Sequence, residues 1–361
     1  MAPRADVLRL AMRAPDDVSA LRERIADGRL APERIIAILA KTEGNGCVND
    51  FTRGYATRCL RDVLAAHLSS DHIARIPLVM SGGTEGGIAP HCIVLTRGEG
   101  PQDEEPALAM AGALTRPLQP NEIGRAAQAR LVRDAVLEAM TDAGISDPRD
   151  AHFIQVKCPL LTAERAAAAG HDVATADMLK SMGLSRGASA LGVALALGEV
   201  DTVTDAQIGT DTALWSSRAS CSAGIELMAC EVVVLGQSAL WSGPMRIAHG
   251  VMQDAIDVPA IAGLLERAAP GAPLQGVGDA AVAVLAKAEA SRCGTIRGRR
   301  HTMLEDSDVS ATRHARAFVG GLIAGLVGHG EIFVSGGAEH QGPDGGGPIA
   351  IIYDTRIGAS P

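Results

Sequence analysis

The segment IIAILAK at residues 35–41 is the first copy of a pattern that returns twice later in the chain. Mostly apolar residues lead to a lysine here, and again in HFIQVK at 152–157 and AVAVLAK at 281–287. Short runs of this composition are typical of buried β-strands. A segment with apolar residues at intervals of three and four, the pattern of an amphipathic helix, precedes each run, at 16–28, 122–144 and 258–271.

The features that follow each lysine also keep one order. An arginine stands in a helix-like segment, at 51–56, 184–196 and 311–325, and an S-x-G-x-E motif comes next, at 81–85, 222–226 and 335–339. A β-branched run closes each unit. We therefore predict an α+β fold of three similar α/β repeat domains, at residues 1–104, 110–250 and 255–361. Three such units pack naturally around a pseudo-three-fold axis, and we expect the active site on that axis.

Composition excludes several classes of protein. The formal net charge of the 361 residues is −9 and only 2% are aromatic, which argues against a nucleic-acid partner. No run of 18 apolar residues occurs, so no membrane span is expected. The seven cysteines are odd in number and form no CxxC motif. We therefore expect reduced thiols and a cytoplasmic location.

The recurring lysines, serines and arginines carry the predicted chemistry. A single lysine at the end of a strand is usually solvated, and a single Ser-Gly-Gly is usually a plain turn, but threefold recurrence favours a shared site. Burial and like charge lower the pKa of a lysine, and a neutral lysine can take the proton of a neighbouring serine nucleophile. Backbone N–H groups in a glycine-rich turn can hold a carbonyl oxygen or an oxyanion. The P-loop and nucleophile-elbow motifs are both absent.

Longer motifs in all three units resemble one known family. They are AKTEGNGCVNDFTR (40–53), VMSGGTEGG (79–87), FIQVKCPLL (153–161), SRGASALG (185–192), SAGIEL (222–227), AKAEAS (286–291), RHTMLEDSD (300–308), TRHARA (312–317) and VSGGAEHQGPDGGGP (334–348). Over nearly the whole chain they resemble the cyanuric acid amidohydrolase / barbiturase family. The resemblance implies three similar domains around a pseudo-three-fold axis, a small cyclic amide substrate on that axis, its hydrolytic ring opening, and a homotetramer.

The resemblance also assigns site residues. The positions that match are Lys41, Lys157, Lys287, Ser81, Ser222, Ser335, Arg53 and Arg186, together with Gly82, Ala223 and Gly336 directly after the serines. The third arginine stays open. Arg313 follows a hydroxyl residue as the first two arginines do, whereas the family pattern favours Arg316, one helical turn later on the same face.

The family implies that Ser222 and Lys157 perform the reaction, which would convert cyanuric acid to 1-carboxybiuret without a cofactor. Alanine follows Ser222, whereas glycine follows the other two serines, so the middle turn differs in sequence from the other two. A structural divalent cation, Mg²⁺ or Ca²⁺, is also implied, because carbonyl oxygens and one carboxylate suit these ions. Its expected ligands are Glu289, Ala338, Gln341, Gly342, Pro343 and Gly346.

Two other functions stay open at this point. A barbiturase would open barbituric acid to ureidomalonate, a ring with CH₂ in place of one N–H. A non-catalytic binding protein for small anions would keep the cationic axis but would need no proton transfer between lysine and serine.

Overall fold

The computed structural model describes residues 1–170 and 172–357. Three four-stranded sheets dominate it, and each joins its strands in the same spatial order, first–fourth–second–third. The first sheet contains β1 (Ala2–Ala11), β2 (Ile35–Thr42), β3 (Leu78–Gly82) and β4 (His91–Gly100). The second contains β5 (Ala107–Leu114), β6 (Ala151–Pro159), β7 (Ala219–Gly224) and β8 (Glu231–Ser238). The third contains β9 (Met245–Met252), β10 (Ala281–Ala288), β13 (Phe333–Gly336) and β14 (Gly347–Asp354). The threefold repeat predicted from sequence is therefore confirmed in the fold.

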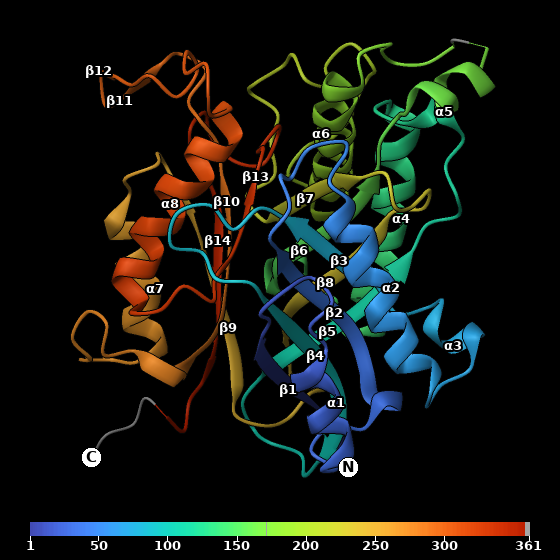
Figure 1. Ribbon diagram of the computed structural model, residues 1–361. Coiled ribbons are helices and arrows are strands. Elements are labelled where there is room, and N and C mark those ends of the chain that lie inside the picture. Colours follow the sequence, from blue (N-terminus) through green and yellow to red (C-terminus); the bar gives the residue numbers. More distant parts are fainter. Residues whose placement is uncertain (171, 358–361) are drawn as a thin grey trace.

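Helices connect these strands and cover the sheets from outside (Figure 1). They are α1 (Ser19–Ala26), α2 (Phe51–Ala65), α3 (Ser70–Ile73), α4 (Ala126–Asp142), α5 (Ala163–Ala168), α6 (Met178–Leu197), α7 (Val258–Ala268) and α8 (Ala311–Val327). Short 3₁₀ turns lie at Pro32–Arg34, Pro120–Glu122, Pro148–Asp150 and Gly278–Ala280, and a small hairpin pairs β11 (Thr295–Ile296) with β12 (Arg299–Arg300). Within the described residues, no helix is both long and apolar enough to cross a membrane.

Alternation along the strands explains how the units meet. In β2, Ala37 and Leu39 join a central cluster that contains side chains from all three sheets, while Ile38 and Ala40 pack outward under α1 and α2. Because side chains alternate with a period of two, Lys41 shares the inward face of Ala37 and Leu39. The same alternation in β10 and β6 directs the other two strand-end lysines toward the centre of the molecule.

Strand pairing also shows where one unit ends and the next begins. β5 starts at Ala107, three residues before the predicted second unit, and β9 pairs along its whole length with β14 of the third sheet. The predicted boundary at 250 therefore falls inside β9. The turn sequence WSGP at 241–244 lies at the junction between β8 and β9, and the pairing of β9 with the distant β14 assigns β9 to the third unit.

Each loop that follows a serine crosses to a neighbouring unit. The loop between β3 and β4 lies against the third unit, where Ala89 N–H donates at 2.7 Å to Gly330 O, between α8 and β13 (Figure 1). The loop after β13 reaches the second unit, where Gly209 N–H donates to His340 Nε2 at 2.7 Å. The loop after β7 approaches α2 of the first unit through Glu226. The three loops thus join the units in one cyclic direction.

Candidate active site

The three lysines lie directly beside the three serines on adjacent parallel strands. Strand register pairs Lys41 with Ser81, Lys157 with Ser222 and Lys287 with Ser335. All six side chains are buried, although each lysine lies within two residues of the end of its strand. The repeat seen in the sequence is therefore a repeat in space, with one lysine–serine corner in each unit.

Each lysine also holds the strand of a neighbouring unit. Lys41 Nζ donates to Val334 O at 2.8 Å, Lys157 Nζ to Met80 O at 2.7 Å, and Lys287 Nζ to Cys221 O at 2.8 Å. Each accepting carbonyl belongs to the residue just before a serine. No corner is therefore built by one unit alone, and the three corners close into a ring.

Burial sets the protonation of these lysines. It lowers the pKa of Lys41 well below the ordinary value, and the Arg316 guanidinium lowers it further. Burial also lowers the pKa of Lys157, against the opposing effect of Glu226, and lowers that of Lys287 to about 7 with help from Arg186. A lowered pKa favours the neutral amine, which is the form that can take a proton from a neighbouring serine.

Three arginines meet three glutamates in the same cyclic order. Arg186 binds Glu339 with two hydrogen bonds, of 2.8 and 2.6 Å. Arg316 binds Glu85 in the same way, at 2.5 and 2.6 Å. In the first unit, Arg53 Nε lies 3.3 Å from Glu226 Oε1.

This arrangement identifies the third arginine. Arg316 is buried, with a side chain 3% exposed, and it faces Glu85 as Arg186 faces its own glutamate. Arg313 also contacts Glu85, at 3.1 Å, but its side chain is 41% exposed. Arg316 therefore holds the place equivalent to the other two arginines, and its role in binding substrate stays a prediction.

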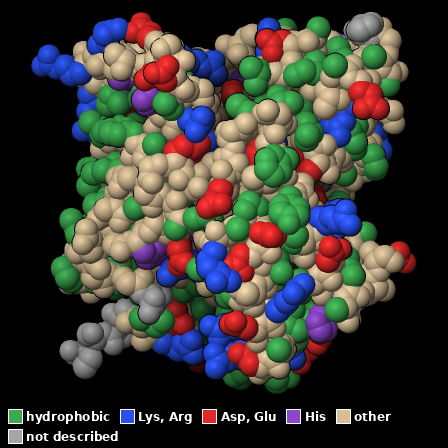
Figure 2. All heavy atoms as spheres, in the orientation of Figure 1, with side chains coloured by type: hydrophobic (Ala, Val, Ile, Leu, Met, Phe, Trp, Pro, Cys, Tyr) green, Lys and Arg blue, Asp and Glu red, His purple; other side chains and the backbone are tan. Residues whose placement is uncertain are grey.

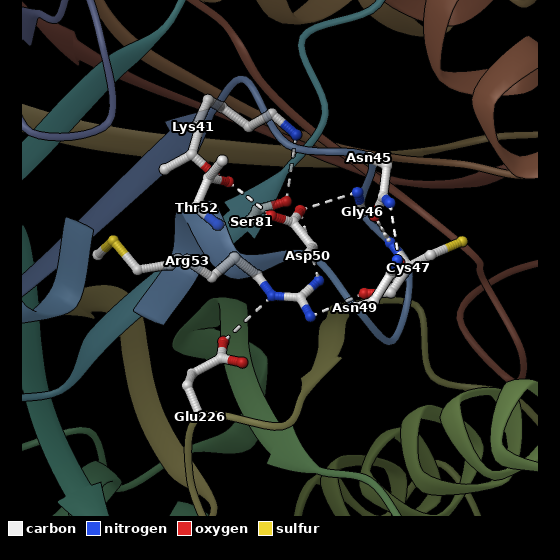
Figure 3. A network of polar contacts seen from close by, with 12 residues as sticks. Lys41, Asn45, Gly46, Cys47, Asn49, Asp50, Thr52, Arg53, Ser81 and Glu226 are labelled. Atoms are coloured by element: carbon white, nitrogen blue, oxygen red, sulfur yellow. Dashed lines mark hydrogen bonds and ion pairs between the residues drawn. The ribbon is translucent and has the colours of Figure 1, made fainter. Parts of the chain in front are cut away.

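The loop before α2 fixes Arg53 through local hydrogen bonds (Figure 3). Asp50 caps the helix, accepting from Thr52 N–H at 3.0 Å and from the Thr52 hydroxyl at 2.6 Å. Its other oxygen accepts from Gly46 N–H at 2.8 Å. A capping carboxylate at this position orients the first helical turn, and so Arg53 points across to Glu226.

Glycines allow the arginines to lie on the serine turns. Gly83 has φ of +101°, a conformation that favours glycine, and an added Cβ would lie 2.3 Å from Arg316 Nη2. Gly337 has φ of +77° and faces Arg186 in the same way. The predicted residues Gly82 and Gly336 end β3 and β13, and Ala223 is the last residue but one of β7.

The middle corner differs from the other two in its hydrogen bonds. Lys41 donates to the Ser81 hydroxyl at 3.1 Å, and Lys287 donates to the Ser335 hydroxyl at 3.3 Å. Among the three serines, all within the described part of the chain, only Ser222 has a buried hydroxyl without a hydrogen-bond partner. Its lysine, Lys157, instead lies 2.9 Å from Glu226 Oε1.

Sequence reasoning missed the three glutamates. Glu85, Glu226 and Glu339 end the S-x-G-x-E motif that identified the serines, but they received no role. Their recurrence with the serines was the available signal. In all three pairs the arginine lies 153 or more residues from its glutamate, and no local pattern gives those contacts.

Four of the six predicted cation ligands lie around one small cavity next to the end of β10. Glu289 accepts a hydrogen bond from Ala338 N–H, and Gly346 N–H donates to Pro343 O at 2.9 Å. A cavity of about 30 Å³ is lined by Glu289, Ala338, Gly342 and Pro343 among others. Gln341 points elsewhere, with its Oε1 accepting from Cys221 N–H at 2.6 Å. Over residues 1–170 and 172–357, no three His, Cys, Asp or Glu side chains cluster as metal ligands.

Known proteins resemble this chain over its full length. A family model described as "Amidohydrolase ring-opening protein" matches residues 6–354. Cyanuric acid amidohydrolase of Azorhizobium caulinodans is 58% identical over 99% of this chain and 100% of its own length. Cyanuric acid amidohydrolase of Enterobacter cloacae is 49% identical over 97% of this chain and 99% of its own length.

Solved structures agree with these sequence relatives. The crystal structure of the A. caulinodans cyanuric acid hydrolase has a TM-score of 0.92, with 98% of this chain and 99% of that chain covered. A second cyanuric acid hydrolase structure, described as an innovation by structural concatenation, has a TM-score of 0.93 at 47% identity, covering 98% of this chain and 100% of that chain. The chain therefore belongs to the family of ring-opening amidohydrolases and is a hydrolase.

Proposed function

We propose that this protein opens the ring of cyanuric acid by hydrolysis and forms 1-carboxybiuret. Full-length similarity to enzymes of that name supports the substrate. The observation that carries the proposal is the threefold lysine–serine register, because cyanuric acid itself has three carbonyls in threefold symmetry. Each corner offers one carbonyl of the ring a serine, a turn with N–H donors and a neighbouring arginine.

In the proposed mechanism Ser222 is the nucleophile and Lys157 the general base. Neutral Lys157 takes the proton from the Ser222 hydroxyl, and the oxygen attacks a ring carbonyl carbon. The C–N bond breaks as Lys157 returns the proton to the ring nitrogen, and water then releases the acyl group from Ser222. Each well-placed oxyanion donor contributes roughly 3 kcal/mol to such a step. The free hydroxyl of Ser222 supports its assignment, since the other two serines are already bound by their lysines.

The test is a side-by-side assay of purified protein with cyanuric acid and barbituric acid. We expect turnover of cyanuric acid, its loss by at least about 10³-fold in Ser222→Ala, and mainly a raised KM in the matched variants Ser81→Ala and Ser335→Ala. Turnover of barbituric acid alone would overturn the substrate. Near-wild-type kcat in Ser222→Ala would overturn the nucleophile.

We further propose a structural Mg²⁺ or Ca²⁺ at the end of β10. The small cavity lined by Glu289, Ala338, Gly342 and Pro343 supports this proposal, because a carboxylate and main-chain carbonyls are the oxygen ligands that hard cations prefer. The Gln341 side chain fits less well, because its oxygen accepts from Cys221 N–H of the second unit and Gln341 does not line this cavity. The ion would stabilise the loop that carries Glu339 and takes no part in the proposed reaction. The homotetramer and the cytoplasmic location stay predictions.

A further inference from the structure

One of the three glutamates lies closer to a lysine than to its arginine. Glu85 and Glu339 each bind an arginine with two short hydrogen bonds. Glu226, in contrast, makes one longer contact with Arg53, at 3.3 Å, and a shorter one with Lys157 Nζ, at 2.9 Å. Both of its oxygens are buried and neither forms a well-aligned hydrogen bond. The departure from threefold symmetry occurs at the corner where Ser222 is free.

Arg53 makes no hydrogen bond to its glutamate comparable with those of the other two arginines. Its Nη2 donates to Cys47 O at 2.9 Å, whereas its buried Nε has no aligned partner. Figure 3 shows the guanidinium between the loop before α2 and the Glu226 carboxylate. Glu226 is therefore shared by two cations, and the smaller distance is to the lysine beside the serine.

Other charged and titratable groups surround the pair. Arg53 approaches from α2, Glu231 stands opposite Lys157 on β8, and Cys158 follows Lys157 on β6. Arg165 of α5 donates to Ile225 O at 2.7 Å, next to Glu226. Glu231 is turned toward the first unit, where its Oε2 accepts from Leu78 N–H at 3.0 Å. Glu226 is thus the carboxylate that contacts the Lys157 amine.

We propose that Glu226 is a positioning residue that completes a Ser222–Lys157–Glu226 array and selects this corner, of the three, for the reaction. The inference rests on the proposed function. Glu226 holds the amine against Met80 O and stabilises the ammonium that forms when Ser222 gives its proton to Lys157. A buried carboxylate that orients a base and stabilises its protonated form is the third member of other serine-based catalytic arrays.

The electrostatic consequences support this role. Burial opposes ionisation of Glu226, but Lys157 and Arg53 together hold the pKa of its carboxyl below the ordinary value. The Glu226 carboxylate in turn raises the pKa of Lys157 against the larger lowering by burial. Removal of this one negative charge should therefore lower the pKa of Lys157 further and weaken it as a base.

The lysine composition permits a direct measurement. The chain has four lysines, Lys41, Lys157, Lys180 and Lys287, and Lys180 is exposed. Protein with ¹³C at lysine Cε therefore gives four NMR signals, assigned by single Lys→Arg variants, with Lys180 as an internal reference. In Glu226→Gln we expect the pKa of Lys157 to fall by about 1 to 3 units, the usual effect of losing an opposite charge at this distance. In the matched variant Glu85→Gln, the pKa of Lys157 should stay in place.

Kinetics then separate positioning from folding. In Glu226→Gln, kcat should fall about 10²-fold and the acidic limb of its pH profile should move to lower pH, because neutral Lys157 is the active form. Glu85→Gln should mainly raise KM through Arg316 and leave the limb in place. Glu226→Asp keeps the charge and should restore the limb, and it serves as the test variant if Glu226→Gln does not fold.

The NMR titration and the activity assays test the role of Glu226 and the proposed function separately. An unchanged Lys157 pKa in Glu226→Gln would overturn the array, as would equal effects of Glu226→Gln and Glu85→Gln on the kcat profile. A wild-type protein inactive on both rings would overturn the proposed function, and the NMR titration would still decide whether Glu226 controls Lys157.

Discussion

Replacing Arg316 by alanine should destabilise the protein much more than replacing Arg313, although both arginines contact Glu85. Arg316 is 3% exposed and binds both carboxylate oxygens, whereas Arg313 is 41% exposed and binds one. Removal of one partner from a buried ion pair costs about 3–5 kcal/mol. Because Arg313 would still contact Glu85, we expect the lower end, about 3 kcal/mol. An exposed pair such as Arg313–Glu85 contributes roughly 0–1 kcal/mol.

Thermal unfolding converts these free energies into measurable shifts. At about 2.1 cal/mol/K per residue, the 361 residues have an unfolding entropy near 0.76 kcal/mol/K. Arg316→Ala should therefore lower Tm by about 4 °C and Arg313→Ala by about 1 °C or less. The KM for cyanuric acid should rise more than about tenfold in Arg316→Ala, and much less in Arg313→Ala. Equal Tm shifts, or a larger KM effect at Arg313, would refute the assignment of the third arginine.

Three further predictions address the turn, the pH response and the cation. Gly83 has a φ of +101°, so Gly83→Ala should lower the free energy of unfolding by about 1–3 kcal/mol, measured by chemical denaturation. It should also raise KM in a substrate titration. An unaltered KM would count against close packing of the arginine on this turn. Burial lowers the pKa of His91, His152 and His249 to about 4, so the unfolded chain binds these protons first and stability should fall as pH drops from 6.5 toward 4. His91 alone accounts for roughly 3 kcal/mol, and a flat denaturation midpoint across that window would contradict it. Saturating Mg²⁺ or Ca²⁺, at about 100 times Kd, should raise Tm by about 3–4 °C in the wild type but not in Glu289→Gln, and equal shifts in both would place the ion elsewhere.

The sequence predicts the threefold fold well because its signals are local and repeat. A strand that ends in lysine, a helix with an arginine and a serine turn are each read from a few neighbouring residues. The parallel register of Lys157 with Ser222 then follows from a shared topology. Three copies also turn a weak motif into a strong one.

Contacts between segments far apart in the sequence lie beyond such reasoning. The choice of Arg316 over Arg313 depends on which side chain is buried against Glu85, more than 200 residues earlier. The pairing of β9 with β14, which moves the last boundary, joins segments about 100 residues apart. Glu226 occupies the same position in the S-x-G-x-E motif as the other two glutamates, so only its contact with Lys157 distinguishes it.

The cyclic contacts have a consequence for how such a molecule can evolve. In a ring of three identical chains, every corner must carry the same side chains, and a mutation that improves one corner for chemistry also changes the two that bind. A single chain removes this constraint, because each corner has its own codons. Two corners can then keep a lysine bound to its serine while the third keeps its serine free. On the proposed function, a ligand with threefold symmetry would then be bound by all three corners and attacked at one of them.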